Sequence, residues 1–230
     1  MPSITLYGSR LSPFVEKVAR ALELKRLPFA QVDVKSPGDL KRWNPVTGKM
    51  PVIEIDGEKT WDSSFILRRL DELSPEPPLF SQDPAVAASQ HMLEDWSDES
   101  LYWYLMALRW CERHVAATLT QISAAAPAPL RPLLKPLLRW QMGSMARVQG
   151  LGRLPYDVLI RETGLRLDDL VSLLGSRPFF FSDRVSGADL AIYGELKGGQ
   201  SGPTPDFAAL VSDRPRLADH MKRVEDATRA

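Results

Sequence analysis

A proline-rich run, SPEPPLFSQDP at residues 74–84, divides the chain into two parts with different sequence patterns. Proline lacks the backbone N–H that helices and strands use, and closely spaced prolines stiffen an extended connector. Short apolar runs separated by turn signals precede this run, and helical periodicities follow it. We therefore expect two domains, residues 1–76 and 85–230, joined by a linker at residues 77–84.

The first part opens with a strand signal and then a helix signal. Ile4 and Leu6 alternate with less apolar neighbours, which predicts a strand that ends at Gly8. A helix is predicted to begin at Pro13, because Ser12 is a favoured N-cap and apolar residues then recur at helical spacing.

Two further strands are predicted at residues 29–34 and 52–55, the second of which continues through a tight turn into a hairpin. Another helix is predicted to begin at Ser63 or Ser64. The order strand, helix, strand, linker, hairpin, helix predicts a small mixed sheet packed by helices. A thioredoxin-like α/β fold has this order.

The second part is predicted to be all helical. The proline-rich segment 127–136 is expected to separate helices rather than form one. Gly175 is expected to end a helix over residues 156–174. Ser186 followed by Asp189 is typical of a helix-opening capping box, which contributes about 1 kcal/mol to folding and no chemistry.

Composition excludes several classes of protein. Lys plus Arg number 29 and Asp plus Glu also number 29, so the net charge does not attract the chain to phosphate backbones or anionic lipid. No apolar stretch approaches the ~20 residues that span a bilayer, and the start lacks the pattern of a secretory signal. We expect a cytoplasmic protein without nucleic-acid or membrane partners.

The cysteine and histidine inventory gives no sign of redox or metal chemistry. Cys111 is the single cysteine, so a dithiol pair within one chain is excluded. Cys111 and His114 lie three residues apart, but a lone pair is more typical of core packing than of a metal site. We expect no metal.

The most informative stretch is NPVTGKMPVIEIDGEKTWDSSFILRRL at residues 44–70. Pro51 stands inside a strand-like run, where it removes a donor from the ladder. A cis Met50–Pro51 bond would turn the chain sharply and leave the backbone of Met50 free to pair with an extended peptide ligand. A trans proline that merely begins the strand is the alternative.

Together with the Ser-Pro-Phe helix start at residues 12–14, this stretch resembles the N-terminal domain of glutathione transferases, most closely the serine-type tau and omega classes. The resemblance covers residues 3–73. It implies a thioredoxin-like α/β N-terminal domain followed by an all-α C-terminal domain. It also implies a glutathione S-transferase that takes glutathione as substrate and conjugates its thiolate to a small apolar electrophile.

The resemblance further implies which residues hold glutathione. Met50, followed by Pro51, would pair with the cysteinyl backbone. Asp62 and Ser63 would hold the γ-glutamyl end, and Lys49 would lie near the glycyl carboxylate. The chemistry of these residues agrees, because a hydroxyl and free N–H groups at a helix start suit one carboxylate and a lysine suits the other.

Ser12 is the catalytic residue that the resemblance implies. Its hydroxyl would donate a hydrogen bond to the glutathione sulfur, and the helix N-terminus would add partial positive charge, so both would favour the thiolate. Tyr7 and Ser9 are alternatives, because other classes place the hydroxyl at those positions, and an ordinary capping role for Ser12 is a third. A serine in place of a cysteine disfavours mixed-disulfide chemistry.

Aromatic residues of the second part allow two interpretations. Trp96, Trp103 and Trp110 fall seven residues apart and are expected to share one stripe of a helix. The stripe either packs between helices or subunits, or Trp103, Tyr104 or Trp96 lines an apolar pocket for the second substrate, to which Tyr7 would also contribute.

Segments 93–110, 149–153 and 173–196 resemble the C-terminal domain of the branch that contains metaxins and failed-axon-connections proteins. Members of that branch are not uniformly transferases. The resemblance therefore implies an alternative function, a non-enzymatic glutathione-binding or protein-interaction module. The superfamily resemblance also implies a homodimer.

Overall fold

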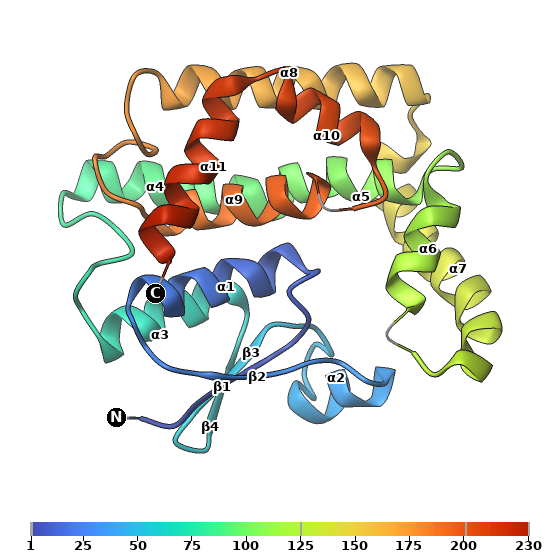
Figure 1. The fold of residues 1–230 in the computed structure, drawn as a ribbon, viewed down its shortest axis with the longest axis horizontal. Coiled ribbons are helices and arrows are strands. Elements are labelled where there is room, and N and C mark those ends of the chain that lie inside the picture. The colour runs from blue at the N-terminus through green and yellow to red at the C-terminus, as the bar shows by residue number, and fades with distance from the viewer. Residues whose placement is uncertain (1, 125, 201, 230) are drawn as a thin grey trace.

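A computed structural model describes residues 2–124, 126–200 and 202–229. Within these residues, a four-stranded sheet covered by helices is followed by a larger group of helices (Figure 1), which confirms the predicted fold class. The strands are β1 Ile4–Tyr7, β2 Ala30–Val32, β3 Val52–Ile55 and β4 Glu58–Trp61. The helices of this part are α1 Pro13–Leu24, α2 Pro37–Trp43 and α3 Ser63–Leu73.

The strand order in the sheet is β2-β1-β3-β4. β2 runs parallel to β1, whereas β3 and β4 each run antiparallel to the strand before them in that order. Ile4, Leu6 and Ile53 are buried in the core that α1 and α3 complete. The strand predicted at residues 29–34 is shorter than expected, because only three of its residues pair with β1.

The helix α2 occupies a segment that was predicted to be a linker. Ser36 and Asp39 form a capping box, with a proline in the first helical turn, so the start signal was present in the sequence. Trp43 at the end of α2 is buried and lies 4.9 Å from the Tyr7 ring, centroid to centroid. The helix therefore covers the face of the sheet opposite α1.

The second part contains the following helices: α4 Pro84–Trp96, the π-helix η1 Ser97–Leu101, α5 Tyr102–Trp110, α6 Val115–Ser123, the 3₁₀ helix η2 Ala128–Leu130, α7 Arg131–Gln149, the 3₁₀ helix η3 Leu151–Arg153, α8 Tyr156–Leu174, α9 Gly187–Gln200, α10 Pro205–Ser212 and α11 Pro215–Thr228. The central helix α9 is buried over almost its whole length. Asp189 accepts hydrogen bonds from the backbone N–H and the hydroxyl of Ser186, so the carboxylate half of the predicted capping box is present.

The prediction that segment 127–136 separates helices is wrong beyond residue 130. α7 begins at Arg131, with Pro132 in its first turn, where no intrahelical N–H bond is required. Pro136 lies inside the helix. Proline spacing alone overestimated the break, because Pro132 costs no hydrogen bond in the first turn and Pro136 removes only one donor from a helix of 19 residues.

The predicted single stripe of tryptophans is also wrong. The π-helix η1 places an extra residue in the turn between Trp96 and Trp103, so the spacing of seven no longer returns to one face. Trp96 packs against the main core, whereas Trp103 packs with Trp110 in a second, smaller cluster.

The helix α9 approaches the start of α1 through two glycines, and these allow a matched test of the packing. A Cβ atom on Gly194 would lie 2.5 Å from the carbonyl oxygen of Pro13, whereas one on Gly198 would lie 3.7 Å from Leu105. Gly194→Ala should destabilise the protein by about 1–3 kcal/mol, because backbone must move to admit the methyl group. Gly198→Ala should be neutral or slightly stabilising, since alanine favours the helix and the contact is ordinary. Urea unfolding of both variants checks the difference, and equal effects would contradict it.

Candidate functional site

Three of the predicted site segments meet at one end of the sheet. Tyr7, the last residue of β1, pairs with Val52, the first residue of β3, and Val52 pairs with Trp61, the last residue of β4. The loop after β1, the Met50-Pro51 pair before β3 and Asp62 after β4 are therefore neighbours, since adjacent strands lie about 4.8 Å apart.

Ser12 occupies the N-cap position of α1. Its backbone is extended, and its carbonyl oxygen accepts the hydrogen bond of the Glu16 N–H at 3.0 Å. Within the described residues its hydroxyl makes no capping hydrogen bond to the helix. A hydroxyl at a helix N-terminus is thus left for another partner, beside the partial positive charge of the helix end.

The Met50–Pro51 bond is cis, as predicted. Met50 lies close to Gly8, where an added Cβ would come within 3.2 Å of the Met50 side chain, so Met50 contacts the loop that leads to Ser12. The preceding turn is held by the buried Asn44, whose side-chain amide donates to the carbonyl oxygen of Lys49 at 3.2 Å. The Lys49 side chain itself is exposed.

Asp62 is the N-cap of α3 and has an unusual backbone conformation. Its φ is 70°, in a region that residues other than glycine rarely adopt. Its carboxylate accepts the Ser64 N–H at 3.0 Å. Ser63, the first residue of the helix, is buried. Strained backbone of this kind is concentrated at binding sites.

A buried lysine connects the start of α3 to the second part of the chain. Lys17 of α1 is only 1% exposed and lies 2.7 Å from Glu94 of α4 and 2.6 Å from Asp98 of η1. The same carboxylates accept hydrogen bonds from the serines of α3, Ser64 to Glu94 at 2.6 Å and Ser63 to Asp98 at 3.4 Å. Lys17 thereby fixes the two acceptors that orient the hydroxyls next to Asp62.

Burial dominates the electrostatics of this cluster. It raises the pKa of Asp98 to about 6, against the opposing attraction of Lys17 and with help from the nearby charge of Glu94. Burial alone would lower the pKa of Lys17, but Asp98 and Glu94 outweigh it and hold that pKa above its usual value. Glu195 of α9 is completely buried, and desolvation followed by repulsion from Asp98 raises its pKa well above the usual range.

Tyr7 is directed to the other face of the sheet. Its hydroxyl donates to Glu54 at 3.1 Å, and Lys59 lies 5.7 Å from its ring centroid. Burial and the hydrogen bond to Glu54 raise its pKa. Ser9, the other alternative to Ser12, accepts the Leu11 N–H through its hydroxyl at 3.4 Å.

Among the aromatic residues of α5, the one that reaches the start of α1 is Tyr102. Its ring lies 4.9 Å from that of Phe14, two residues after Ser12. Trp103 packs in the small cluster beside α7, and the Tyr104 ring lies 5.9 Å from the guanidinium of Arg166 on α8. Tyr102 was not among the predicted site residues, because no sequence pattern marks the π-helix η1 that sets the rotation of α5.

Residues 6–78 match the family model described as glutathione S-transferase, N-terminal domain. The match contains Ser12, Met50 and the start of α3, and so includes the end of the sheet described above. This part of the chain is therefore similar in sequence to the N-terminal domain of glutathione S-transferases.

Relatives named glutathione S-transferases support an enzyme of this kind, and a solved glutathione transferase structure shares the fold. The chain is 26% identical to isoprene-epoxide–glutathione S-transferase of Rhodococcus sp. strain AD45, over 96% of this chain and 97% of that one. It is 36% identical to glutathione S-transferase U9 of Arabidopsis thaliana, but only over 35% of each chain. The structure of rice GST1 in complex with glutathione superposes with a TM-score of 0.67 at 22% identity, covering 99% of this chain and 89% of that one.

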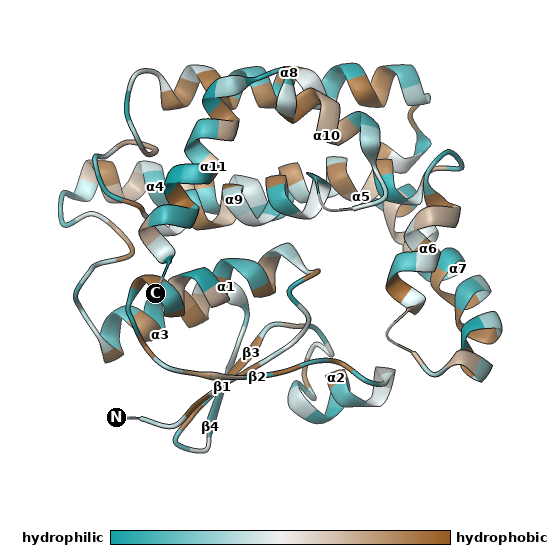
Figure 2. Ribbon diagram, viewed as in Figure 1, coloured by the Kyte–Doolittle hydropathy of each residue, from teal (hydrophilic) through white to brown (hydrophobic). Residues whose placement is uncertain are grey.

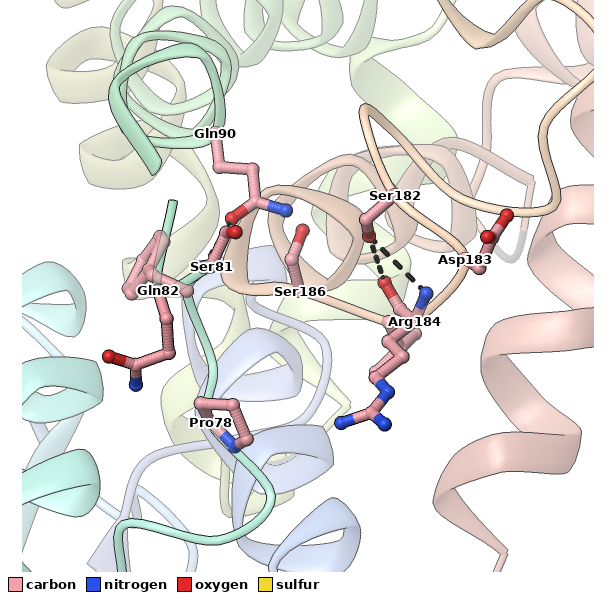
Figure 3. A pocket seen from close by; sticks show the side chains of 10 residues that line it. Pro78, Ser81, Gln82, Gln90, Ser182, Asp183, Arg184 and Ser186 are labelled. Atoms are coloured by element: carbon pink, nitrogen blue, oxygen red, sulfur yellow. Dashed lines mark hydrogen bonds between the residues drawn. The ribbon is translucent and has the colours of Figure 1, made fainter. Parts of the chain in front are cut away.

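A cavity of about 270 Å³ lies away from Ser12. It opens between the linker and the loop before α9, with Gln90, Arg184 and Ser186 around it (Figure 3). Gly194, which contacts Pro13, is eight residues further along α9 than Ser186, or about 12 Å along the helix axis. The cavity is therefore separate from the site at the sheet end.

The described residues contain no group of three or more His, Cys, Asp and Glu side chains arranged to hold a metal ion. Cys111 donates to the carbonyl oxygen of Leu108, and His114 lies 3.3 Å from the Tyr156 hydroxyl. None of the helices in the described part combines the length and the apolar character that a membrane span requires.

Proposed function

We propose that the protein is a glutathione transferase that joins the glutathione thiolate to a small apolar electrophile. The observation that carries this proposal is the position of the Ser12 hydroxyl. It lies at the N-terminus of α1 and makes no capping hydrogen bond to the helix. It is also at the same end of the sheet as Met50 and Asp62. The match of residues 6–78 to the family model and the similarity to a named transferase support it. By residue pattern we assign the enzyme to the serine type, close to the tau class.

Each residue has one task in the proposed mechanism. The backbone of Met50, beyond the last ladder pair of β3, pairs with the cysteinyl unit of glutathione. Ser63 and the carboxylate of Asp62 hold the γ-glutamyl end, and Lys49 attracts the glycyl carboxylate. Ser12 donates a hydrogen bond to the sulfur. Because the thiolate is the nucleophile, a bond and a helix end that favour it increase the reactive fraction.

The electrophile class is inferred from the wall of the site and from a relative. Phe14 and Tyr102 form an apolar pair beside Ser12, and we propose this pair for the second-substrate pocket in place of Tyr7, Trp103 and Tyr104, whose contacts lie elsewhere. Because one relative is named for isoprene epoxide, a small epoxide is our first candidate. The sulfur–carbon bond would form as the carbon–oxygen bond of the epoxide breaks, and the resulting alkoxide would take a proton from water.

Two measurements on the same preparation test the function. Turnover of small epoxides and aryl halides with glutathione measures the transfer, and calorimetric titration with glutathione alone measures the first binding step. Binding with turnover supports the transferase. Binding without turnover of any electrophile would favour the alternative, a non-enzymatic glutathione-binding or protein-interaction module of the metaxin-like branch.

Ser63→Ala should weaken glutathione binding by about 1–3 kcal/mol, because a charge-assisted hydrogen bond to the γ-glutamyl carboxylate is lost. Ser64→Ala is the matched control, since that hydroxyl is already engaged by Glu94 at 2.6 Å. Calorimetry with both variants should show the loss for Ser63→Ala alone. A wild-type protein without response to millimolar glutathione would contradict the assignment of this site.

We also infer that the enzyme is a cytoplasmic homodimer, as the superfamily resemblance implies. Light scattering at micromolar concentration measures the mass directly. A monomeric mass would remove the dimer from the proposal and leave the site within one chain unchanged.

A further inference from the structure

The helix α7 carries an apolar stripe on its outer face. Leu133, Leu137, Trp140 and Val148 are 72%, 53%, 70% and 84% exposed. At 100° per residue these positions fall within about 80° of one another around the helix. Leu130, in the turn just before α7, is also exposed and extends the stripe.

The opposite face of the same helix is the one that packs. Leu138 and Met142 contact the small cluster formed by α5 and α6, and Gly143 and Ala146 are buried. Large apolar side chains on the outer face are therefore not needed for the fold. Contiguous exposed apolar residues of this kind mark a surface that binds something.

The charge around this stripe is of one sign. Residues 113–156, which we call the basic hairpin, contain six Lys and Arg and no Asp or Glu. The rest of the chain then holds 23 Lys and Arg against all 29 Asp and Glu. The net charge of zero hides this separation of a basic segment from an acidic remainder. The expectation of no membrane partner rested on the net charge alone.

Among the described residues, acidic groups outside the hairpin pair with two of its six cations, Arg139 and Arg113. Glu112 accepts two hydrogen bonds from Arg139, and Asp206 of α10 lies 4.0 Å from Arg113. Lys135, Arg147 and Arg153 have no carboxylate partner among the described residues, although Arg147 donates to the Gly143 carbonyl oxygen. The part of the hairpin that bears the stripe is thus cationic.

The shape of the hairpin is that of a projection rather than a groove. In Figure 1 α6 and α7 extend away from the other helices, and Figure 2 shows hydrophobic and hydrophilic residues interleaved along them. A convex apolar ridge flanked by cations suits a lipid interface, where leucine and tryptophan enter the headgroup region and cations meet anionic lipid. A partner protein would need a groove of its own to receive it.

We propose that the basic hairpin docks this protein on an anionic lipid surface, with Leu133, Leu137 and Trp140 inserted at the interface. A second copy of the chain fits less well, because pairing two stripes would bring two cationic hairpins together, and like charges across an interface are unfavourable. The cations supply long-range attraction that salt weakens, and the stripe supplies contact that salt does not remove. The proposal is independent of the proposed transferase activity.

Vesicle flotation with the full chain tests the proposal. We expect wild-type protein to float with vesicles of equal phosphatidylcholine and phosphatidylglycerol at low salt, and to float much less with phosphatidylcholine alone. The double variant Leu133→Ser/Leu137→Ser should reduce the bound fraction at least about tenfold, as should Arg147→Glu/Arg153→Glu, since both arginines are exposed. Met92→Ser is the matched control, because Met92 on α4 is 74% exposed but lies outside the hairpin, and it should bind as wild type.

Tryptophan fluorescence gives a second measurement on the same samples. The emission should shift to shorter wavelength with the anionic vesicles, and Trp140→Phe should remove most of the shift while the other tryptophans remain. Wild-type protein that fails to float with anionic vesicles would overturn the proposal. So would a concentration-dependent dimer that Leu133→Ser/Leu137→Ser dissociates, because the stripe would then be a self-interface.

Discussion

Ser12→Ala should lower the turnover of reactive electrophiles roughly 100-fold while it leaves the affinity for glutathione within about twofold. The hydroxyl stands at the N-terminus of α1 without a capping bond, so its loss removes a donor to the sulfur and leaves the helix intact. Met50, Asp62 and Ser63 still hold the peptide. A drop of two units in a thiol pKa corresponds to about 2.7 kcal/mol, which one charge-assisted bond and a helix end can supply together.

The thiolate absorbance of bound glutathione, followed against pH, measures this effect directly. Ser12→Ala should move the titration to higher pH. Tyr7→Phe and Ser9→Ala are the controls, and neither should move it, because Tyr7 donates to Glu54 and Ser9 accepts the Leu11 N–H. A shift for Tyr7→Phe alone would transfer the catalytic role to the tyrosine. Loss of glutathione binding in Ser12→Ala would mean that Ser12 is structural.

Lys17→Met should reduce the free energy of unfolding by about 3–5 kcal/mol at pH 8, because it leaves the carboxylates of Glu94 and Asp98 buried without their cation. Methionine keeps most of the volume, so the effect is electrostatic rather than a cavity. Lys59→Met is the control. Its contact with Glu54 is 3.6 Å long and partly exposed, so its loss should cost below about 1 kcal/mol.

The loss of stability caused by Lys17→Met should be larger at high pH than at low pH. The folded-state pKa of Asp98 is about 6, above the unfolded value near 4, so Asp98 contributes stability that is complete below pH 4 and is lost as the pH rises through 6. Without Lys17 the pKa of Asp98 rises further, because the cation that favours its ionised form is gone. Ionising Asp98 at pH 8 then destabilises the folded state more. The variant should therefore be closer to wild type at pH 5 than at pH 8. Urea unfolding at the two pH values measures this, and a pH-independent difference would contradict the assignment.

Local signals made much of the fold predictable from the sequence. β1, α1 and the hairpin of β3 and β4 follow from short alternating or periodic runs with a cap or a turn at their ends. The cis bond at Pro51 followed from a proline where a strand needs a donor. The resemblance to a known N-terminal domain added the fold of the second part, which periodicity alone would have left as a set of helices.

The features that the sequence did not predict depend on contacts between distant segments. The π-helix η1 rotates α5 so that Tyr102, rather than Trp103, faces Phe14, and no local pattern marks that turn. The partnership of Lys17 with Asp98 joins residues that are 81 positions apart. A lysine among the apolar positions of α1 could have been noticed, but its partners could not be named from spacing.

The close approach of α9 to the first turn of α1 limits how this architecture can be recombined. Gly194 allows the backbone of α9 to contact the backbone of Pro13. The position of α1, and with it Ser12, therefore depends on a helix that lies about 180 residues later in the sequence. A chimaera that joins this N-terminal domain to a foreign helical domain would need a residue without a side chain at the equivalent place. The two parts therefore have to be transferred together, although each has its own class of fold.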